Sequence, residues 1–443
     1  MVFITTLVLA VVLFINYYVF DGDVTSPPFL FVLTFIVSMT DLAINLPIWH
    51  TTINTEPLFI VLFGGIIFSI TSIIIHVYFG RKNKNRIENI EDKEPPYIYV
   101  ANWKLILFLL FQIIVIVFVQ YYVKKLTSPY GTDGSLSSSI SMYQYLTKFT
   151  TLDLDFPKWL TYTYIISNSS DFVWGYILIY DFFFFKKINP LLVINLLVSA
   201  AGSFLTGSRG VAVQMIMSLI VIYIMFYRDS GKEINWIKVL KKPFLILLVL
   251  LLSFRYLAKL LGRDHSLSIF EYISVYLGAP IKNFESFLNT NFNSTQPAWG
   301  YNTFSMQWQW LSEKFNLGIP KNTINVDMQY LNGHNLGNVF TAYKNYILDF
   351  GVLGAFICII VAAIIMGFMY EDTKGFKEFR MTRVFSFDWQ KMCYTYLLIS
   401  LSFTFFSNKF YETFTVTFLQ RIICWILLGY IFCKPKLRGK QIV

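Results

Sequence analysis

Charged residues are scarce in this sequence. Aspartate, glutamate, lysine and arginine make up 14% of its 443 residues, against about 25% in ordinary soluble domains. Cysteine is scarce as well: the four cysteines lie in or beside apolar stretches and form no Cys-x-x-Cys pair, so neither a disulfide framework nor a zinc site is indicated. The metalloprotease, Walker A and dinucleotide-binding motifs do not occur, and we therefore expect no metal and no nucleotide cofactor.

Hydrophobic residues, by contrast, make up 56% of the chain, and the mean hydropathy is +0.55. A helix needs about 20 consecutive apolar residues to cross a bilayer. Apolar runs of suitable length lie at residues 2–20, 29–49, 58–79, 103–123, 159–185, 190–206, 210–227, 243–260, 340–369, 391–407 and 414–433. This pattern predicts an all-α polytopic membrane protein with about eleven transmembrane helices and excludes a soluble enzyme.

The net charge of +10 is spread over the breaks between the apolar runs, so we expect the lipid bilayer, and no nucleic acid, as a partner. The short breaks are rich in lysine and arginine, whereas the two long breaks, 124–158 and 261–339, hold few of them. By the positive-inside rule the short breaks are cytoplasmic and the long ones external, which predicts an external N-terminus. The predicted organisation is therefore transmembrane helices in 1–260, a large external loop at 261–339, and further helices with a basic cytoplasmic tail in 340–443.

The first candidate site is the turn Leu205–Gly210 between two predicted helices on the outer side. Its glycines allow a ligand to approach the backbone closely. Ser208 and the amides that open the next helix can hold an anion, and Arg209 can bind phosphate with two parallel hydrogen bonds. The alternative is an ordinary turn whose arginine reaches the lipid headgroups.

The second candidate site follows the eighth apolar run. Arg255, Lys259 and Arg263 are spaced four residues apart, so a continuing helix would carry them as one cationic stripe at its outer end. Three titratable residues come next, Asp264, His265 and Glu271. Cations beside a base at the lipid–water boundary fit a pyrophosphate-linked substrate, and the alternative is headgroup anchoring with a local Arg–Asp pair.

The third candidate site is Gly333–Asn338, near the end of the long loop. His334 titrates in the range that suits a general base. Lys344, at the mouth of the next predicted helix, can pair with an acid or with the substrate. The alternative for His334 is an ordinary solvated loop histidine.

Four motifs of the chain, in their order, resemble those of the Wzy oligosaccharide repeat-unit polymerases, which are related to the O-antigen ligases. They are Thr206–Gly210, Gly262–Asp264 with Glu271, Tyr276–Pro280, and Asn338–Thr341 through Asp349–Gly354. The large external loop late in the chain and the basic inner loops are also similar to that family. The resemblance covers most of residues 100–430.

The resemblance implies a metal-independent, multipass glycosyltransferase of GT-C-like architecture in the bacterial cytoplasmic membrane. Such an enzyme transfers a growing capsule or exopolysaccharide glycan from undecaprenyl pyrophosphate to another lipid-linked repeat unit at the outer face, alongside a flippase and a chain-length regulator. It implies that Arg209, Arg255 and Arg263 hold pyrophosphates. The further substrate contacts, Ser208, Lys259 and Lys344, are indicated by their own residue types and positions. His334 is then the base, with His265, Asp264 and Glu271 as alternatives.

Two other functions stay open. An O-antigen ligase would differ only in its acceptor. A flippase or other transporter would carry ionisable residues in mid-helix along a path, for which Asp41, Asp181 and Arg421 are the candidates. Because the ionisable residues of the three candidate sites gather at the outer rim instead, the sequence favours surface chemistry over transport.

Overall fold

A computed structural model describes residues 1–87, 97–150, 152, 154–207, 209–230, 268–290, 296–322, 328–374 and 387–436, together with a few positions between 239 and 249. The chain divides into two compact units. Unit 1 comprises Met1–Glu88, Ser266–Thr373 and Leu397–Thr415, and unit 2 comprises Asn89–His265, Lys374–Tyr396 and Val416–Val443. The sequence predicts a different kind of division, into consecutive segments with boundaries at residues 260 and 339. That division stays a prediction.

Within the described ranges, six helices are long and apolar enough to cross a membrane. They are α1 (Val2–Val19), α2 (Pro27–Ile48), α3 (Thr55–Ile87), α4 (Asn102–Thr127), α8 (Arg209–Asp229) and α13 (Tyr343–Thr373). The apolar helices α7 (Pro190–Phe204) and α17 (Val416–Phe432) are shorter. These helices confirm a helical membrane protein, whereas the count of eleven spans and the GT-C-like architecture stay predictions.

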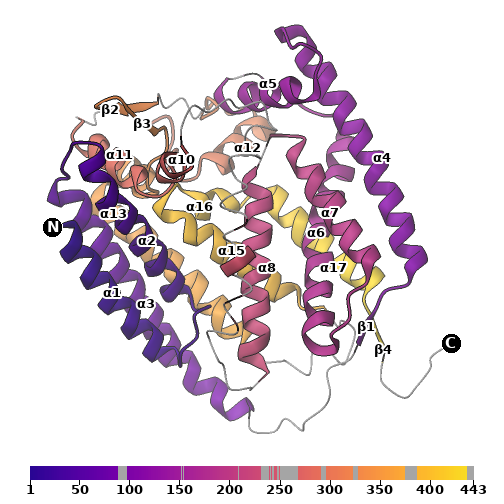
Figure 1. Ribbon diagram of the computed structural model, residues 1–443, viewed down its shortest axis with the longest axis horizontal. Helices are drawn as coiled ribbons and strands as arrows, with labels where there is room; N and C mark the ends of the chain where they lie inside the picture. The colour runs from indigo at the N-terminus through magenta and orange to yellow at the C-terminus, as the bar shows by residue number, and fades with distance from the viewer. Residues whose placement is uncertain are drawn as a thin grey trace. The chain divides into compact units, whose positions relative to one another are not determined.

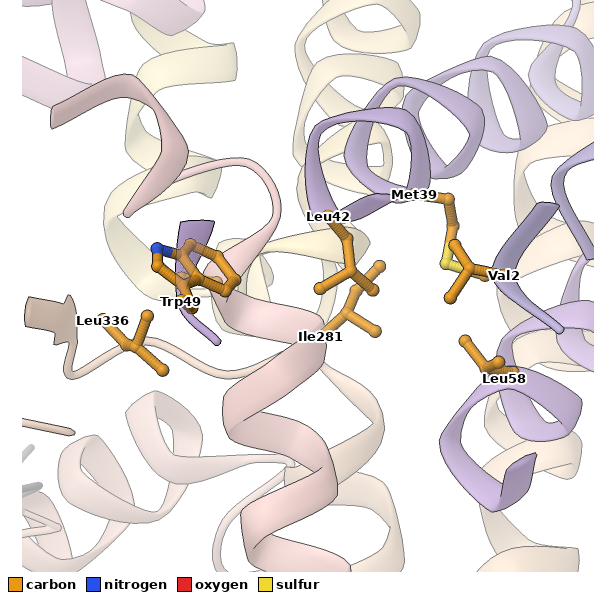
Figure 2. Close-up of a cluster of buried hydrophobic side chains, with 8 residues drawn as sticks. Val2, Met39, Leu42, Trp49, Leu58, Ile281 and Leu336 are labelled. Atoms are coloured by element: carbon orange, nitrogen blue, oxygen red, sulfur yellow. The ribbon is translucent and has the colours of Figure 1, made fainter. Parts of the chain in front are cut away.

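Unit 1 is built on α1, α2 and α3, which lie side by side, with α13 packed against α3 (Figure 1). One end of this group carries a buried apolar cluster shown in Figure 2. Its members come from the start of α1, the end of α2, the start of α3 and the 261–339 segment: Val2, Met39, Leu42, Trp49, Leu58, Ala279, Ile281 and Leu336. The beginning of the chain and the long loop therefore share one end of unit 1, and the side of the membrane that this end faces stays a prediction.

The opposite end of unit 1 is held by polar contacts. The Tyr370 hydroxyl donates to Asp23, in the α1–α2 turn, at 2.8 Å. His76 Nδ1 lies 2.6 Å from Glu371 Oε1. The turn after α1, the part of α3 around His76 and the last turn of α13 thus meet at this end, which agrees with alternate crossing directions for these helices.

The long loop folds into short elements, and a hairpin closes it. These elements are α10 (Ile269–Ser274), α11 (Ala279–Leu288), α12 (Ser305–Phe315), β2 (Gln329–Leu331) and β3 (His334–Gly337). β2 pairs antiparallel with β3. Asn332 and Gly333, at the hairpin turn, have φ angles of 50° and 84°, the left-handed pair that an Asn-Gly hairpin turn favours. The remaining elements of unit 1 are η2 (Phe403–Phe405) and α16 (Lys409–Thr413).

Unit 2 packs α4, α6 (Lys158–Phe185), α7, α8 and α17 together, with α5 (Leu136–Phe149) against α4. A short turn of helix, η1 (Ser128–Tyr130), follows α4, and the first half of α15 (Trp389–Ser402) belongs to this unit. β1 (Tyr97–Tyr99) pairs antiparallel with β4 (Lys434–Lys436). At the end of α8, Lys391 Nζ lies 2.6 Å from Asp229 in a buried ion pair.

Candidate functional site

The predicted site in the long loop lies on a cap formed by α10, α11 and the β2–β3 hairpin at the end of unit 1 that holds Val2 (Figures 1 and 2). Apolar contacts alone would let such short elements slide. Polar side chains therefore fix the position of the cap, through three attachments to the rest of unit 1.

The first attachment joins the Tyr276–Pro280 motif to α2. Asp41 Oδ2 accepts a hydrogen bond from the Gly278 amide at 2.9 Å, and Oδ1 accepts one from the Ser274 hydroxyl at 3.1 Å. Ser38 donates to the Leu277 carbonyl at 2.6 Å. A Cβ atom at Gly278 would lie 2.6 Å from the Leu42 amide nitrogen, so only glycine fits this close approach. Asp41, considered from the sequence as part of a transport path, is an anchor for the cap.

The second attachment is made by α11. Its buried pair Lys282 and Glu285 form an ion pair, and Glu285 also accepts a hydrogen bond from the Asn54 amide. The fully buried Asn283 donates from Nδ2 to the carbonyls of Leu336 and Val339, at 3.0 and 2.9 Å. α11 thus joins the α2–α3 connection on one side to the hairpin on the other.

The third attachment holds the hairpin tip. Asn332 donates from Nδ2 to the carbonyls of Trp49 and His50, at 2.9 and 3.1 Å. At the other end of the hairpin, a Cβ atom on Gly337 would lie 2.6 Å from Val275 Cγ1. The hairpin therefore packs closely beside α10, and His334, the first residue of β3, is placed by both contacts.

This packing leaves His334 within electrostatic range of Glu271, another of the predicted site residues. The Glu271 carboxylate closes a capping box at the start of α10: Oε2 accepts from the Ser268 amide at 2.9 Å, and the Glu271 amide donates to the Ser268 hydroxyl. The hydrogen bonds from the Ser268 side chain and backbone hold the pKa of Glu271 below its usual range, and attraction to His334 acts in the same direction. The Glu271 carboxylate is thus engaged in capping α10. With its lowered pKa it is a poorer base than a carboxylate without such hydrogen bonds.

Lys344, in the first turn of α13, is a half-buried cation. Its ammonium lies 3.7 Å from the centre of the Phe340 ring and 5.7 Å from that of Phe287. No carboxylate forms an ion pair with it among the residues that the structure describes. A cation held on aromatic faces without an acid beside it is suited to an anionic ligand.

The Asp349–Gly351 motif shapes α13. Gly351 has φ 68° and ψ −177°, which interrupts the helix. Asp349 accepts hydrogen bonds from the amides of Asn302 and Thr303, and Phe350 packs on Trp299 with ring centres 4.9 Å apart. The motif therefore attaches the segment before α12 to the start of a membrane helix.

Below this kink, α3 and α13 border an open groove of about 360 Å³. Its walls are one face of α3 from Thr55 to Phe63, with Val352 and Phe356 of α13. Glu56 and Thr55 provide the polar groups in a lining that is otherwise apolar. The groove is open to the outside of unit 1, since Phe59 and Phe63 are 45% and 50% exposed.

The remaining predicted residues are less completely described. Arg209 opens α8, directly after the turn containing Gly207, whose φ is 73°. The turn thus occurs where the sequence predicts it, while the role of Arg209 stays a prediction. The other members of the first two candidate sites lie outside the described residues: Ser208, Arg255, Lys259, Arg263, Asp264 and His265.

Unit 2 contains a polar cluster around Arg421, which the sequence analysis considered only as part of a transport path. Arg421 of α17 donates from Nη1 to the Tyr396 hydroxyl at 2.8 Å. The buried Asp171 and the hydroxyl of Tyr164, both on α6, lie near enough to attract it electrostatically. The available signal was that Asp171 and Arg421 interrupt the apolar runs 159–185 and 414–433, and charges inside a membrane segment are functional candidates by default.

The chain was compared with protein-family models, curated proteins and solved structures, and nothing matches it significantly in any of the three.

Proposed function

We propose that this protein is an oligosaccharide repeat-unit polymerase of the bacterial cytoplasmic membrane. It would transfer a growing glycan from undecaprenyl pyrophosphate to a second lipid-linked repeat unit at the outer face. The observation that supports this proposal is the cap, in which His334 lies within electrostatic range of Glu271, while Lys344, later in the chain, is a cation without a carboxylate partner among the described residues. This combination offers a base for a hydroxyl and a charge for a phosphate.

The proposed step needs no further reactant. The acceptor hydroxyl oxygen attacks the anomeric carbon of the donor, and the bond between that carbon and the pyrophosphate oxygen breaks. The proton of the hydroxyl passes to His334, and the electron pair leaves with undecaprenyl pyrophosphate. Lys344, together with Arg209, Arg255 and Arg263 in their predicted role, offsets the charge of the leaving group.

The membrane-facing features support lipid-linked substrates. An isoprenoid chain is apolar and flexible, and the groove between α3 and α13 offers an open apolar surface of matching character. Because α13 carries both Lys344 and the groove residues Val352 and Phe356, one helix can contact the phosphate and the lipid chain of the same molecule.

The test is a glycolipid profile of cells that lack the gene. If the proposal is right, single undecaprenyl-linked repeat units accumulate at the outer face and polymer disappears. Inward-facing single units would identify a flippase, and normal polymer that is never attached would identify a ligase.

Complementation then tests the assigned base. His334→Ala is expected to leave protein in the membrane but restore no polymer. His50→Asn is the matched control, because it removes an exposed imidazole, keeps the carbonyl that accepts from Asn332, and suits the φ of 49° at this position. Equal polymer from both variants would remove His334 from the mechanism.

The polar cluster in unit 2 favours one second candidate. Arg421 and Asp171 are ionisable residues on helices that lie in apolar runs, as a transporter of lipid-linked oligosaccharides would require. The sidedness of the accumulated glycolipid distinguishes this candidate from the polymerase.

A further inference from the structure

Arg421 in unit 2 is a cation whose hydrogen-bonding capacity is largely unused. An arginine side chain carries five N–H donors, and in the described part of the chain Arg421 makes one hydrogen bond, to the Tyr396 hydroxyl. No carboxylate of the described residues lies within ion-pair distance of its guanidinium. Leaving a charged group in this state inside a membrane helix is costly, so its retention needs an explanation.

The guanidinium is held in place by a rigid aromatic surround. It lies 5.8 Å from the centre of the Tyr396 ring. That ring is stacked on Phe418, with centres 5.2 Å apart, and meets Trp425 edge-on at 5.8 Å. Because Trp425 is fully buried and donates its indole N–H to the Ser169 carbonyl, Tyr396 has little freedom, and the cation is preorganised.

Polar groups of α6 continue from Arg421 toward the outer turn. Asn168 is 7% exposed, and its Oδ1 has no hydrogen-bond partner. The Tyr164 hydroxyl makes hydrogen bonds of 3.2 Å to the Gly202 carbonyl and 3.3 Å to Thr206 Oγ1, and it also bonds to the Asn168 side chain. Thr206 begins the Thr206–Gly210 turn, so these groups connect the interior cation with that turn.

Asp171 does not form the direct ion pair that would explain a charged Arg421 in this helix. One of its oxygens accepts the Phe172 amide at 2.7 Å, and its attraction to Arg421 acts without direct contact. A structural ion pair in a low-dielectric interior would close to hydrogen-bond distance, because the Coulomb energy rises steeply there. The gap leaves the donors of Arg421 available to a ligand.

We propose that Arg421, with Tyr396, Asn168 and Tyr164, forms a phosphoryl-binding site inside unit 2, below the Thr206–Gly210 turn. The guanidinium fork matches two phosphate oxygens, and the free Asn168 oxygen accepts a hydroxyl group of the same molecule. The phosphoryl group comes from a polyprenyl pyrophosphate or from an anionic lipid headgroup. Its identification with the glycan donor or acceptor rests on the proposed function, whereas the binding itself does not.

The test uses the full-length protein in nanodiscs of phosphatidylcholine, with farnesyl pyrophosphate as the probe and thermal unfolding as the readout. Wild type is expected to be stabilised by the probe in a saturable way. Arg421→Gln is expected to lose at least about tenfold in apparent affinity, and Arg421→Lys is expected to be intermediate because it keeps the charge without the fork. Asp171→Asn is expected to bind the probe more tightly, since a repelling charge is removed.

The double variant Arg421→Gln/Asp171→Asn keeps the experiment decisive if the single variant fails to fold. If Arg421 only neutralises Asp171, the double variant is stable and responds to the probe like wild type, which would overturn the proposal. If Arg421 binds phosphate, the double variant is stable and does not respond.

A second set of nanodiscs identifies the source of the phosphoryl group. Stabilisation by phosphatidylglycerol that depends on Arg421 and removes any response to farnesyl pyrophosphate would assign the site to a lipid headgroup. Stabilisation by farnesyl pyrophosphate in either lipid would assign it to a polyprenyl substrate. An unchanged wild-type response in every Arg421 variant would reject the site while leaving the polymerase proposal untouched, because that proposal depends on glycolipid accumulation.

Discussion

The carboxylate of Asp41, in the membrane helix α2, accepts a hydrogen bond from the backbone amide of Gly278 at 2.9 Å. The two residues are 237 positions apart in the chain, and their contact joins the Tyr276–Pro280 motif to the N-terminal helices. A motif of the proposed polymerase is thus held by a residue that lies outside every motif. The cap is expected to depend on this contact.

Gly278→Ala and Asp41→Ala are expected to detach the cap. The new Cβ at position 278 would meet the α2 backbone at 2.6 Å, and loss of Asp41 leaves the Gly278 amide and the Ser274 hydroxyl without their acceptor, at about 1–3 kcal/mol. Thermal unfolding in detergent measures the loss. Thr40→Ala is the control, because Thr40 is exposed and bonds only within its own helix; equal stability of all three variants would contradict the anchoring role.

Asp349→Ala is expected to release the segment before α12. Its carboxylate accepts from the amides of Asn302 and Thr303 and from the Asn302 side chain at 2.9 Å, so several donors lose their partner at once. Limited proteolysis should cut this segment in the variant faster than in wild type. Glu412→Ala removes only a half-exposed ion pair with Lys409, worth at most about 1 kcal/mol, and should leave the cutting rate unchanged.

Lys282→Met is expected to destabilise unit 1 strongly. It leaves the buried Glu285 without its cation, which typically costs about 3–5 kcal/mol. The double variant Lys282→Met/Glu285→Leu should recover part of this loss, because no unpaired charge then remains. A double-mutant cycle on the free energy of unfolding measures the coupling, and a coupling near zero would show that the pair contributes nothing.

Lys344→Met is expected to abolish chain growth with little change in stability. The methylene stem can keep its contacts with Phe340 and Phe287, whereas the charge proposed to bind the pyrophosphate is lost. Polymer length distribution and a thermal melt are measured on the same preparation. Wild-type polymer from Lys344→Met, or unfolded protein, would contradict a role in binding.

Acid is expected to loosen α10 through Glu271. Its pKa is held low by Ser268, so the capping box stabilises the fold above the pKa of the unfolded carboxyl, about 4.3, and is lost as the pH falls through the lower folded value. The effect is small because Glu271 is solvent-accessible. Hydrogen exchange across residues 269–274, corrected for intrinsic rates, should rise on acidification in wild type; Ser268→Ala should show raised exchange already at neutral pH.

The positions of the membrane helices could be predicted from the sequence. Long apolar runs predict helices because a backbone in lipid must satisfy its own hydrogen bonds, and helices occur at α1, α2, α3, α4, α8 and α13 as predicted. The Asn332–Gly333 turn is likewise determined by its own residues, since few residue types adopt the left-handed backbone conformation that it needs. The distribution of lysine and arginine also predicts an order of crossings from the sequence alone, and that order stays a prediction.

Tertiary structure decided which polar residues meet. Asp41 and Arg421 look alike in the sequence, as single charges in apolar runs, yet Asp41 is bonded to the cap, while Arg421 makes one hydrogen bond among the residues that the structure describes. The sequence alone determined the helical membrane class and which residues carry side chains able to bind a ligand or transfer a proton. Their separation into anchors and binding groups came only from the fold, because a hydrogen bond depends on ångström-scale distances between segments whose separation in the chain says nothing about their proximity.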